Sequence, residues 1–365
     1  MRSIRRWLGL AAAAGIIASA CSGTAAPTAG PAAAVRLQLQ WAPQAQFAGY
    51  FAADKEGYYK AEGLTVTMVP GGPDVVPQQV GSAANGPEFT ISWVPKVLEA
   101  RGQSSDLVDI AQIFQRSGTK SVSWKETGIT KPADFSGKKI GVWDFGNEYE
   151  VTAAAKKAGL TPGAGFTKVI QPFDMSLLLK KDIDAAEAMI YNEYAQVLES
   201  TNPATGQLYK PEDLNVIVYN AEGTAMLQDA IFARAAWLAQ GTNADVATRF
   251  LRASFKGWIF CRDNPAKCVD YTTAAGSTLG KGHQAWMMNE INPLIWPSPA
   301  SIGQLDPNLW KQTVDISLAA GVIKAAPPDA AFRTDLAKKA LEGISGDTTG
   351  ASFKKGTVTV TAKGE

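Results

Sequence analysis

The first regular segments of the chain are visible in the spacing of their apolar residues. Residues 35–41 alternate between apolar and polar side chains, which predicts a β-strand that ends at Trp41. Within residues 44–59 the apolar positions instead fall three or four apart, which predicts a helix. Residues 64–68 alternate again and precede the turn-rich sequence Pro-Gly-Gly-Pro at 70–73. Because the helix is long enough to connect two parallel strands, these residues predict a strand–helix–strand unit.

Short strands and helices continue to alternate along the rest of the first two hundred residues. Up to residue 114 we expect helices at 75–82 and 94–101 and strands at 89–93 and 107–114. After a break at residues 116–118 we expect strands at 139–143, 168–171 and 185–190, with helices at 148–158 and 175–180. Two such sets predict two α/β lobes. The roughly 330 residues after residue 34 are also too many for one ordinary core.

The C-terminal third is predicted to be mostly helical. After a strand at residues 215–219 the pattern turns helical from about residue 235. Further helices are expected at 266–275, 282–289 and 307–320. Residues 344–365 are polar and rich in Gly and Thr, and we expect a poorly specified tail.

Residues 1–21 have the pattern of an export signal. Three arginines precede an apolar run of about 11 residues, which is shorter than the roughly 20 that a membrane-spanning helix needs. The small residues at 18–20 stand directly before Cys21, as in the bacterial lipobox, so we expect Cys21 to be lipidated. Ordinary cleavage beside an incidental cysteine is the alternative. Residues 22–34 contain only Ser, Gly, Thr, Ala and Pro and predict a flexible tether. The protein is therefore expected outside the cytoplasm, anchored to the cell membrane by Cys21.

Charge and cysteine content narrow the partners and the compartment. The chain has 35 Lys and Arg against 34 Asp and Glu, and no basic run carries interleaved aromatics, so we expect no nucleic-acid partner. Cys261 and Cys268 can pair in an exported protein. On one continuous helix their Cα atoms would lie about 10.5 Å apart, which is too far for a disulfide. Asn264-Pro265 between them predicts the start of a new helix, and a corner there would close the gap. Two buried thiols are the alternative.

Residues typical of common enzyme classes are absent from the sequence. His283 is the only histidine, and no Cys or carboxylate set has metal-ligand spacing. No phosphate-binding loop and no dinucleotide fingerprint follow a predicted strand. We therefore expect no catalytic residues, no metal and no cofactor, and we interpret His283 as a surface or packing residue.

Aromatic residues with polar neighbours recur where predicted strands lead into helices. Open α/β sheets bind ligands at this edge, beyond the carboxyl ends of their strands. The candidate ligand-binding residues at these turns are Trp41, Gln44, Phe47, Trp93, Trp143, Asn147, Glu148, Tyr191, Asn192 and Glu193. A planar heterocycle suits such a site, because each stacked ring contributes about 0.5–1.5 kcal/mol beyond burial and the polar groups can bond the ring edge. Taken singly, each aromatic can instead serve core packing, and Glu148 can stabilise a helix N-terminus.

Several short motifs match the pattern of one known family. They are Trp41-Ala42-Pro43, Phe47-Ala48-Gly49-Tyr50, Gly57-Tyr58-Tyr59, Glu62-Gly63-Leu64 and Pro70-Gly71-Gly72, with supporting matches at 135–143, 184–186 and 191–193. Over roughly residues 35–320 the chain resembles the NMT1/THI5-like branch of periplasmic binding proteins.

The resemblance implies an α/β, two-lobed periplasmic binding protein type II fold. Each lobe would be a mixed, mostly parallel sheet flanked by helices, and the lobes would close by hinge motion over a ligand delivered to an ABC transporter permease. It further implies a monomer whose first lobe is discontinuous. Lobe 1 would comprise residues 35–118 and 222–343 and lobe 2 residues 119–221, with crossings near 117–121 and 219–224.

The resemblance also ranks the possible ligands. Trp41 and Tyr191 lie where pyrimidine-binding members stack their ligand, and Glu193 lies near where they hold its edge, so we expect a thiamine pyrimidine precursor or a flavin. A small sulfonate, nitrate or taurine-like anion held by helix N-termini and Arg116 is the first alternative. A pyrimidine synthase is the second, but the family enzyme needs a histidine near the N-terminal Trp motif, where this chain has Gln46.

Overall fold

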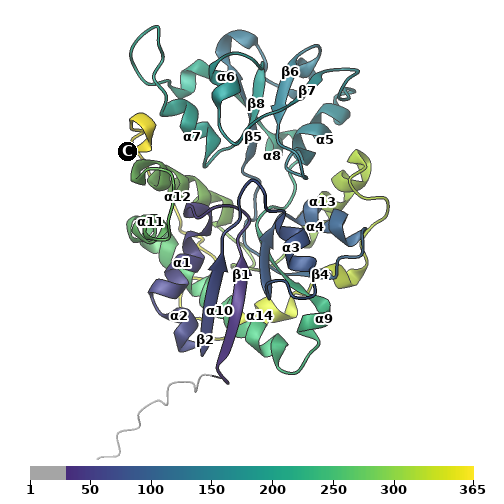
Figure 1. The fold of residues 1–365 in the computed structure, drawn as a ribbon, viewed down its shortest axis with the longest axis vertical. Coiled ribbons are helices and arrows are strands. Elements are labelled where there is room, and N and C mark those ends of the chain that lie inside the picture. Colours follow the sequence, from purple (N-terminus) through teal and green to yellow (C-terminus); the bar gives the residue numbers. More distant parts are fainter. Residues whose placement is uncertain (1–29) are drawn as a thin grey trace, which may run out of the picture.

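The computed structural model describes residues 30–365 as two α/β lobes, one above the other in Figure 1. Lobe 1 is built on a five-stranded sheet of order β2-β1-β3-β10-β4, and lobe 2 on a five-stranded sheet of order β7-β6-β8-β5-β9. The strands of lobe 1 are β1 (Ala33–Gln38), β2 (Leu64–Val69), β3 (Phe89–Ser92), β4 (Leu107–Gln112) and β10 (Ala230–Arg234). Those of lobe 2 are β5 (Thr119–Trp124), β6 (Lys139–Val142), β7 (Thr167–Ile170), β8 (Ala185–Met189) and β9 (Leu214–Val218).

Both sheets are mixed. In each, the first strand after the chain arrives from the other lobe is antiparallel to both of its neighbours. In lobe 1, β10 pairs antiparallel with β3 and β4, while β1 pairs parallel with β2 and β3. In lobe 2, β5 pairs antiparallel with β8 and β9, while β6 pairs parallel with β7 and β8. The chain thus crosses between the lobes after β4 and again between β9 and β10. These two crossings are the only covalent links between the lobes in the described part of the chain.

Helices flank both sheets. In lobe 1 they are α1 (Ala48–Lys55), α2 (Tyr58–Ala61), α3 (Pro77–Ser82), α4 (Val94–Arg101), α9 (Ala235–Leu238), α10 (Asn243–Asp263), α11 (Pro265–Ala274), α12 (Lys281–Ile295), α13 (Pro307–Ala320) and α14 (Asp335–Leu341). In lobe 2 they are α5 (Tyr149–Lys157), α6 (Ser176–Leu179), α7 (Glu193–Leu198) and α8 (Tyr219–Glu222). None of the helices among residues 30–365 is long and apolar enough to cross a membrane.

The predicted helix at residues 44–59 is broken into three pieces. A short 3-10 turn, η1 (Ala45–Phe47), precedes α1, and α2 follows after Gly57. Gly57 has a φ of 74°, a left-handed conformation that ends α1 and that residues with a Cβ rarely adopt. The strand–helix–strand connection itself agrees with the predicted unit.

The core of lobe 1 fixes α10 against the sheet and against α1. Phe250 of α10 stacks on Phe89 of β3, with ring centroids 3.9 Å apart. A Cβ at Gly49 would collide with the ring of Trp258, so the absence of a side chain there lets α1 and α10 approach closely. The segment between β1 and α1 is therefore attached to a closely packed part of lobe 1.

Two expectations for the ends of the chain need correction. Residues 1–29, which include Cys21, lie outside the described residues. The tether predicted at residues 22–34 is too long at its C-terminal end, because Ala33 and Ala34 already pair with β2. The tail was predicted to be poorly specified, yet its backbone is held in place. Ser298 N donates to Thr349 O at 2.8 Å, and Lys363 N donates to Glu199 O of lobe 2 at 3.0 Å. Irregular segments of this kind have no periodicity from which a sequence pattern could place them.

Cys261 and Cys268 are joined in a disulfide at the corner between α10 and α11. Their Cα atoms lie 5.5 Å apart, because α10 ends at Asp263 and α11 begins at Pro265.

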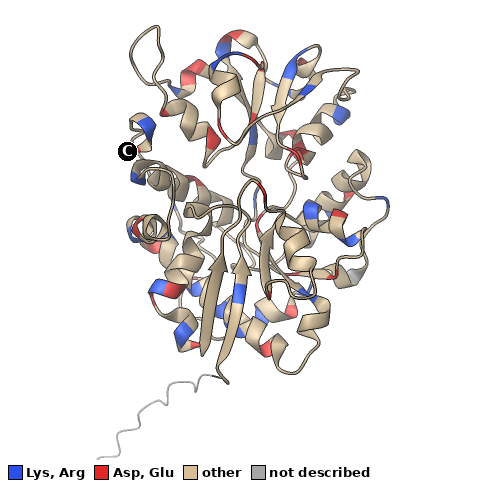
Figure 2. Ribbon diagram, viewed as in Figure 1, with Lys and Arg blue, Asp and Glu red and all other residues tan. Residues whose placement is uncertain are grey.

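Charged residues of both signs are interspersed over the two lobes, as Figure 2 shows.

Candidate functional site

An open cavity lies between the two lobes. It is placed where β1 and β3 of lobe 1 and β6 and β8 of lobe 2 reach their carboxyl ends, the edge at which α/β sheets bind ligands. The lining residues are Gln40, Trp41, Gln44, Gln46, Gly72, Pro73, Val75, Val76, Pro77, Gln78, Trp93, Lys96, Trp143, Phe145, Asn147, Phe173, Met189, Tyr191, Asn192 and Glu193. Both lobes therefore contribute to one site.

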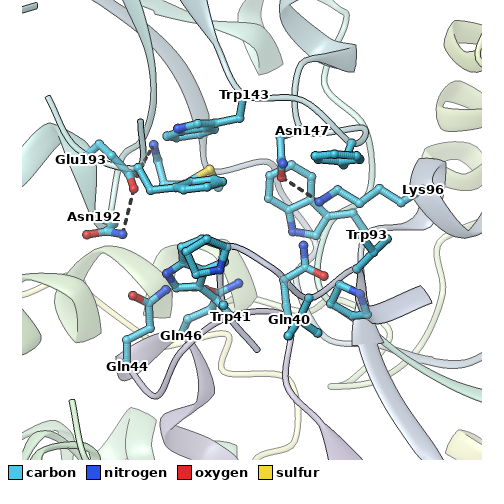
Figure 3. A pocket seen from close by; sticks show the side chains of 18 of the residues that line it. Gln40, Trp41, Gln44, Gln46, Trp93, Lys96, Trp143, Asn147, Asn192 and Glu193 are labelled. Carbon is cyan, nitrogen blue, oxygen red and sulfur yellow. Dashed lines mark hydrogen bonds between the residues drawn. The ribbon is translucent and has the colours of Figure 1, made fainter. Parts of the chain in front are cut away.

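Aromatic rings from the two lobes face each other in this cavity. Trp41 of lobe 1 lies 4.4 Å from Phe173 of lobe 2, and Phe173 in turn stacks on Trp143 at 6.0 Å with ring planes 17° apart. In Figure 3, Trp143 and Trp41 extend toward the cavity from opposite sides. The indole of Trp143 is held because its Nε1 donates to Pro172 O at 3.1 Å. Phe173 is 39% exposed and lies against Trp41, so a planar ring would enter between Trp41 and Trp143 only by displacing it.

A buried carboxyl group, Asp229, orients the lobe 1 side of the cavity. It accepts hydrogen bonds from Trp93 Nε1 at 2.8 Å and from Gln46 Nε2 at 2.9 Å. Gln46 Oε1 accepts in turn from Gln44 Nε2 at 2.6 Å. Burial raises the pKa of Asp229 to about 7, and the two donors partly oppose that rise. These hydrogen bonds hold the Trp93 ring and the Gln46 and Gln44 amides in place, while Asp229 itself does not line the cavity.

Glu193 and Asn192 form one polar end of the cavity. Glu193 Oε2 accepts from Met189 N at 3.0 Å, and its Oε1 accepts from Asn192 Nδ2 at 2.9 Å. Burial raises the pKa of Glu193 to about 7. Asn192 Oδ1 lies 3.0 Å from Nε2 of His283, which belongs to lobe 1. This end therefore offers oxygen acceptors to a ligand and also joins the two lobes.

Lys96 forms the other polar end. Its Nζ donates to Asn147 Oδ1 of lobe 2 at 2.7 Å and lies 4.4 Å from the centroid of the Trp93 ring. Burial lowers the pKa of Lys96 to about 8, while Glu148, Glu187 and Asp229 act in the opposite direction. Figure 3 shows Lys96 and Glu193 at opposite ends of the cavity.

Most of the sequence-predicted residues line the cavity, but three do not. The eight that line it are Trp41, Gln44, Trp93, Trp143, Asn147, Tyr191, Asn192 and Glu193. Phe47 is completely buried in the core of lobe 1. Arg116 is turned away and donates to the carbonyl oxygens of Pro293 and Pro297. Glu148 closes its own loop by accepting from Gly146 N at 3.0 Å.

Sequence reasoning missed other residues of the cavity wall. These are Gln40, Gly72, Pro73, Val75, Val76, Pro77, Gln78, Lys96, Phe145, Phe173 and Met189, while Gln46 was noted only as a neighbour of Trp41. Two of them carried a usable signal. Lys96 follows Trp93 by three residues at the start of a helix and so lies on the same face. Phe173 follows β7, so the strand-end rule would have found it.

His283 is not a surface residue. Both ring nitrogens reach lobe 2, with Nδ1 2.9 Å from the Glu199 carboxylate and Nε2 3.0 Å from Asn192 Oδ1. Among residues 30–365 no group of three or more His, Cys, Asp and Glu side chains is arranged to hold a metal ion.

Comparisons of the sequence with known proteins identify a family and several relatives. The NMT1/THI5-like family model matches residues 44–268, more than half of the chain. The riboflavin-binding protein RibY of Chloroflexus aurantiacus is 26% identical over 333 residues, which cover 85% of this chain and 91% of that protein. The 4-amino-5-hydroxymethyl-2-methylpyrimidine phosphate synthase of Aspergillus parasiticus is 24% identical over 244 residues, which cover 65% and 69%.

Solved structures share the fold. The alkanesulfonate-binding protein SsuA of Xanthomonas axonopodis pv. citri, bound to MOPS, superposes with a TM-score of 0.60 at 13% identity. The match covers 84% of this chain and 100% of that one. Together with the two five-stranded sheets, this likeness confirms the expected two-lobed periplasmic binding protein fold.

Proposed function

The chain belongs to the NMT1/THI5-like family, and from this premise we propose that it is the solute-binding component of an ABC importer for a planar aromatic heterocycle. The observation that carries the proposal is the pair of aromatic walls, Trp41 on lobe 1 and Phe173 with Trp143 on lobe 2. A flat ring that displaces Phe173 and lies between Trp41 and Trp143 would contact both lobes at once. Such contacts favour the closed form, because a ligand shifts a two-state equilibrium only through its differential affinity for the two states.

A flavin is the ligand that the comparisons favour. The RibY relative binds riboflavin and aligns over 85% of this chain. A thiamine pyrimidine precursor, a smaller planar ring with the same stacking and edge chemistry, is the second ligand class of this proposal.

A small anion fits the cavity less well. Arg116, the cation expected to hold it, bonds to backbone carbonyls instead of facing the cavity. Lys96 is the one cation among the cavity-lining residues, and the rest of the wall is aromatic, aliphatic or amide in character. A sulfonate or nitrate would leave most of that aromatic surface without a partner.

The protein is placed outside the cytoplasm in this proposal, as a monomer held at the membrane. The signal-like residues 1–21 and the lipobox-like position of Cys21 support a lipid anchor. An anchored binding protein stays within reach of the permease that receives its ligand. Replacing Cys21 by Ser is expected to release a folded, ligand-competent protein from the membrane, and retention of that variant would count against lipidation.

Isothermal titration of purified residues 30–365 tests the function. Riboflavin, 4-amino-5-hydroxymethyl-2-methylpyrimidine, taurine and nitrate are titrated separately at pH 7. We expect micromolar or tighter binding of at least one heterocycle and no heat from the two anions. Binding of taurine or nitrate with no response to either heterocycle would overturn the proposal.

A further inference from the structure

Lys96 is a buried cation with unused hydrogen-bonding capacity. The residue is 4% exposed, and an ammonium group carries three N–H donors. One donates to Asn147 Oδ1 at 2.7 Å. When the Gln40 amide is oriented so that its nitrogen donates to Ile91 O at 3.2 Å, its oxygen accepts a second from Lys96 at 2.9 Å. The third N–H has no protein acceptor among the described residues, and Lys96 lines the cavity.

Lys96 also lacks an ion pair. Within residues 30–365 no carboxylate oxygen lies within 4.0 Å of its Nζ, although Glu148, Glu187 and Asp229 act on it from farther away. A buried charge without a counter-charge costs free energy, which an acceptor brought by a ligand would lower. Burial depresses the pKa of Lys96 to about 8, so the group is still mostly protonated at pH 7.

The opposite end of the cavity has the complementary chemistry. Glu193 presents carboxyl oxygens that already accept from Met189 N and Asn192 Nδ2, and a carboxylate can accept further bonds. Trp41 and Trp143 lie between this end and Lys96 (Figure 3). The cavity is thus an aromatic slot with a donor at one end and acceptors at the other.

We propose that Lys96 is a specificity-determining residue that receives a carbonyl-bearing edge of the ligand and so fixes the direction of the ring in the slot. The inference rests on the proposed function. The opposite edge, with its N–H or O–H donors, then faces Glu193. A cationic ring would be rejected, because its charge would lie beside a buried ammonium that has no carboxylate partner.

The bond from Lys96 to Asn147 requires a control, because it crosses from lobe 1 to lobe 2. A loss of affinity on replacing Lys96 could arise from weaker lobe closure alone. Replacing Asn147 by Ala removes that bond and keeps the ammonium. The pH dependence of affinity supplies a second control. If it persists in Asn147→Ala, where the interlobe bond is absent, it does not arise from lobe closure through that bond.

The experiment measures riboflavin affinity by calorimetry at pH 7 and pH 9 in the wild type, Lys96→Met, Asn147→Ala and Lys60→Met. Lys60 is an exposed lysine on α2 and serves as the matched control. If only the protonated lysine binds the carbonyl edge, a pKa of about 8 makes wild-type affinity fall about tenfold between these pH values. Lys96→Met is expected to lose about tenfold or more at pH 7 and to show no such fall. Lys60→Met is expected to keep both the wild-type affinity at pH 7 and its fall at pH 9. Asn147→Ala, which alters the cavity wall, is expected to keep the fall of about tenfold between the two pH values whatever its affinity at pH 7.

Each outcome decides the matter. Lys96→Met removes an unpaired buried charge and is expected to fold, which thermal unfolding checks. Lys96→Gln is measured as a second variant in case Lys96→Met does not fold. Riboflavin affinity in Lys96→Met within about twofold of the wild type overturns the inference and leaves the proposed function intact. A fall in affinity of about tenfold from pH 7 to pH 9 that persists in Lys96→Met also overturns it. Glu193 and Asp229, with pKa values of about 7, do not produce such a fall, because a ligand that binds their carboxylate forms gains no more than about twofold from each over this range. A wild type that binds no riboflavin overturns the flavin proposal and this inference together.

Discussion

At the scale of single residues, Trp41 is the clearest test of the aromatic slot. It is the lobe 1 ring that faces Phe173 at 4.4 Å, and it lies three residues beyond Gln38, the last residue of β1. We expect Trp41→Ala to weaken riboflavin binding by about tenfold or more, because a stacked ring contributes up to about 1.5 kcal/mol beyond burial. Trp310→Ala is the matched control, since Trp310 packs on Phe332 and does not line the cavity. Equal affinities of the two variants in calorimetry would contradict this role.

The buried carboxyl groups make stability depend on pH. Burial raises the pKa of Asp109, Glu150, Glu193 and Asp229 to about 7, well above their ordinary values. The folded state therefore binds more protons than the unfolded chain between about pH 4 and pH 7, and stability is lost as pH rises through this window. We expect the unliganded Tm to fall by several degrees from pH 5 to pH 7.5. Scanning calorimetry measures it.

Replacing one of these carboxyl groups measures its contribution to the pH dependence of stability. Glu193→Gln keeps the shape of the side chain and removes its titration, so the fall in Tm between pH 5 and pH 7.5 should become shallower. Exposed Glu342→Gln, for which no such change is expected, is the control. An unchanged slope in Glu193→Gln would show that Glu193 does not titrate in this range.

Side-chain direction explains which site residues the sequence could predict. Trp41, Trp93, Trp143 and Tyr191 follow strand ends closely, and the sheet geometry alone brings such positions to the cavity. Phe47 lies several residues farther along, where the packing of η1 and α1 decides its direction. Arg116 is held by carbonyl oxygens of residues 293 and 297, about 180 positions away. No local pattern encodes such contacts.

At the scale of elements, the corner between α10 and α11 is stapled by the disulfide. A bridge that closes a short loop restricts the unfolded chain and contributes about 2–3 kcal/mol. We expect the double variant Cys261→Ala, Cys268→Ala to lower the free energy of unfolding by about that amount. Riboflavin affinity should be unchanged, because neither cysteine lines the cavity. Urea unfolding measures the first effect and calorimetric titration the second, and a large loss of affinity would contradict the separation.

Two strands, β5 and β10, were not predicted. Burial on both faces does not explain this, because β3, β4 and β8 are also buried throughout and were predicted. β5 has the mostly polar sequence Thr-Lys-Ser-Val-Ser-Trp, and β10 leads directly into α9, so neither stands out as an apolar run bounded by turn residues. Strands such as β1, with its alternating sequence, were predicted closely. The two missed strands are the antiparallel members next to the hinge crossings.

At the scale of the whole molecule, closure depends on contacts between the lobes outside the aromatic slot. His283 of α12 joins Glu199 and Asn192 of lobe 2, and Trp286 Nε1 donates to Ile190 O at 3.1 Å. Figure 1 shows the C-terminal segment beside α12 and α7, where Lys363 N bonds to Glu199 O. These bonds would stabilise the closed form only, because water can replace them when the lobes part.

His283→Ala is therefore expected to speed ligand release. Loss of its two interlobe contacts should raise the dissociation rate of riboflavin by about threefold to tenfold, with a smaller change in the association rate. Lys281→Ala is the control, since Lys281 pairs with Asp270 within lobe 1. Stopped-flow fluorescence measures both rates. Identical dissociation rates in the two variants would show that His283 does not hold the lobes together.

Native mass spectrometry of the full chain, purified without refolding, tests the central claim most directly. A ligand held between two lobes should remain bound and add its mass to that of the folded protein. The account predicts an added mass equal to that of a flavin or of a thiamine pyrimidine precursor. An added mass equal to that of a sulfonate, nitrate or taurine would contradict it.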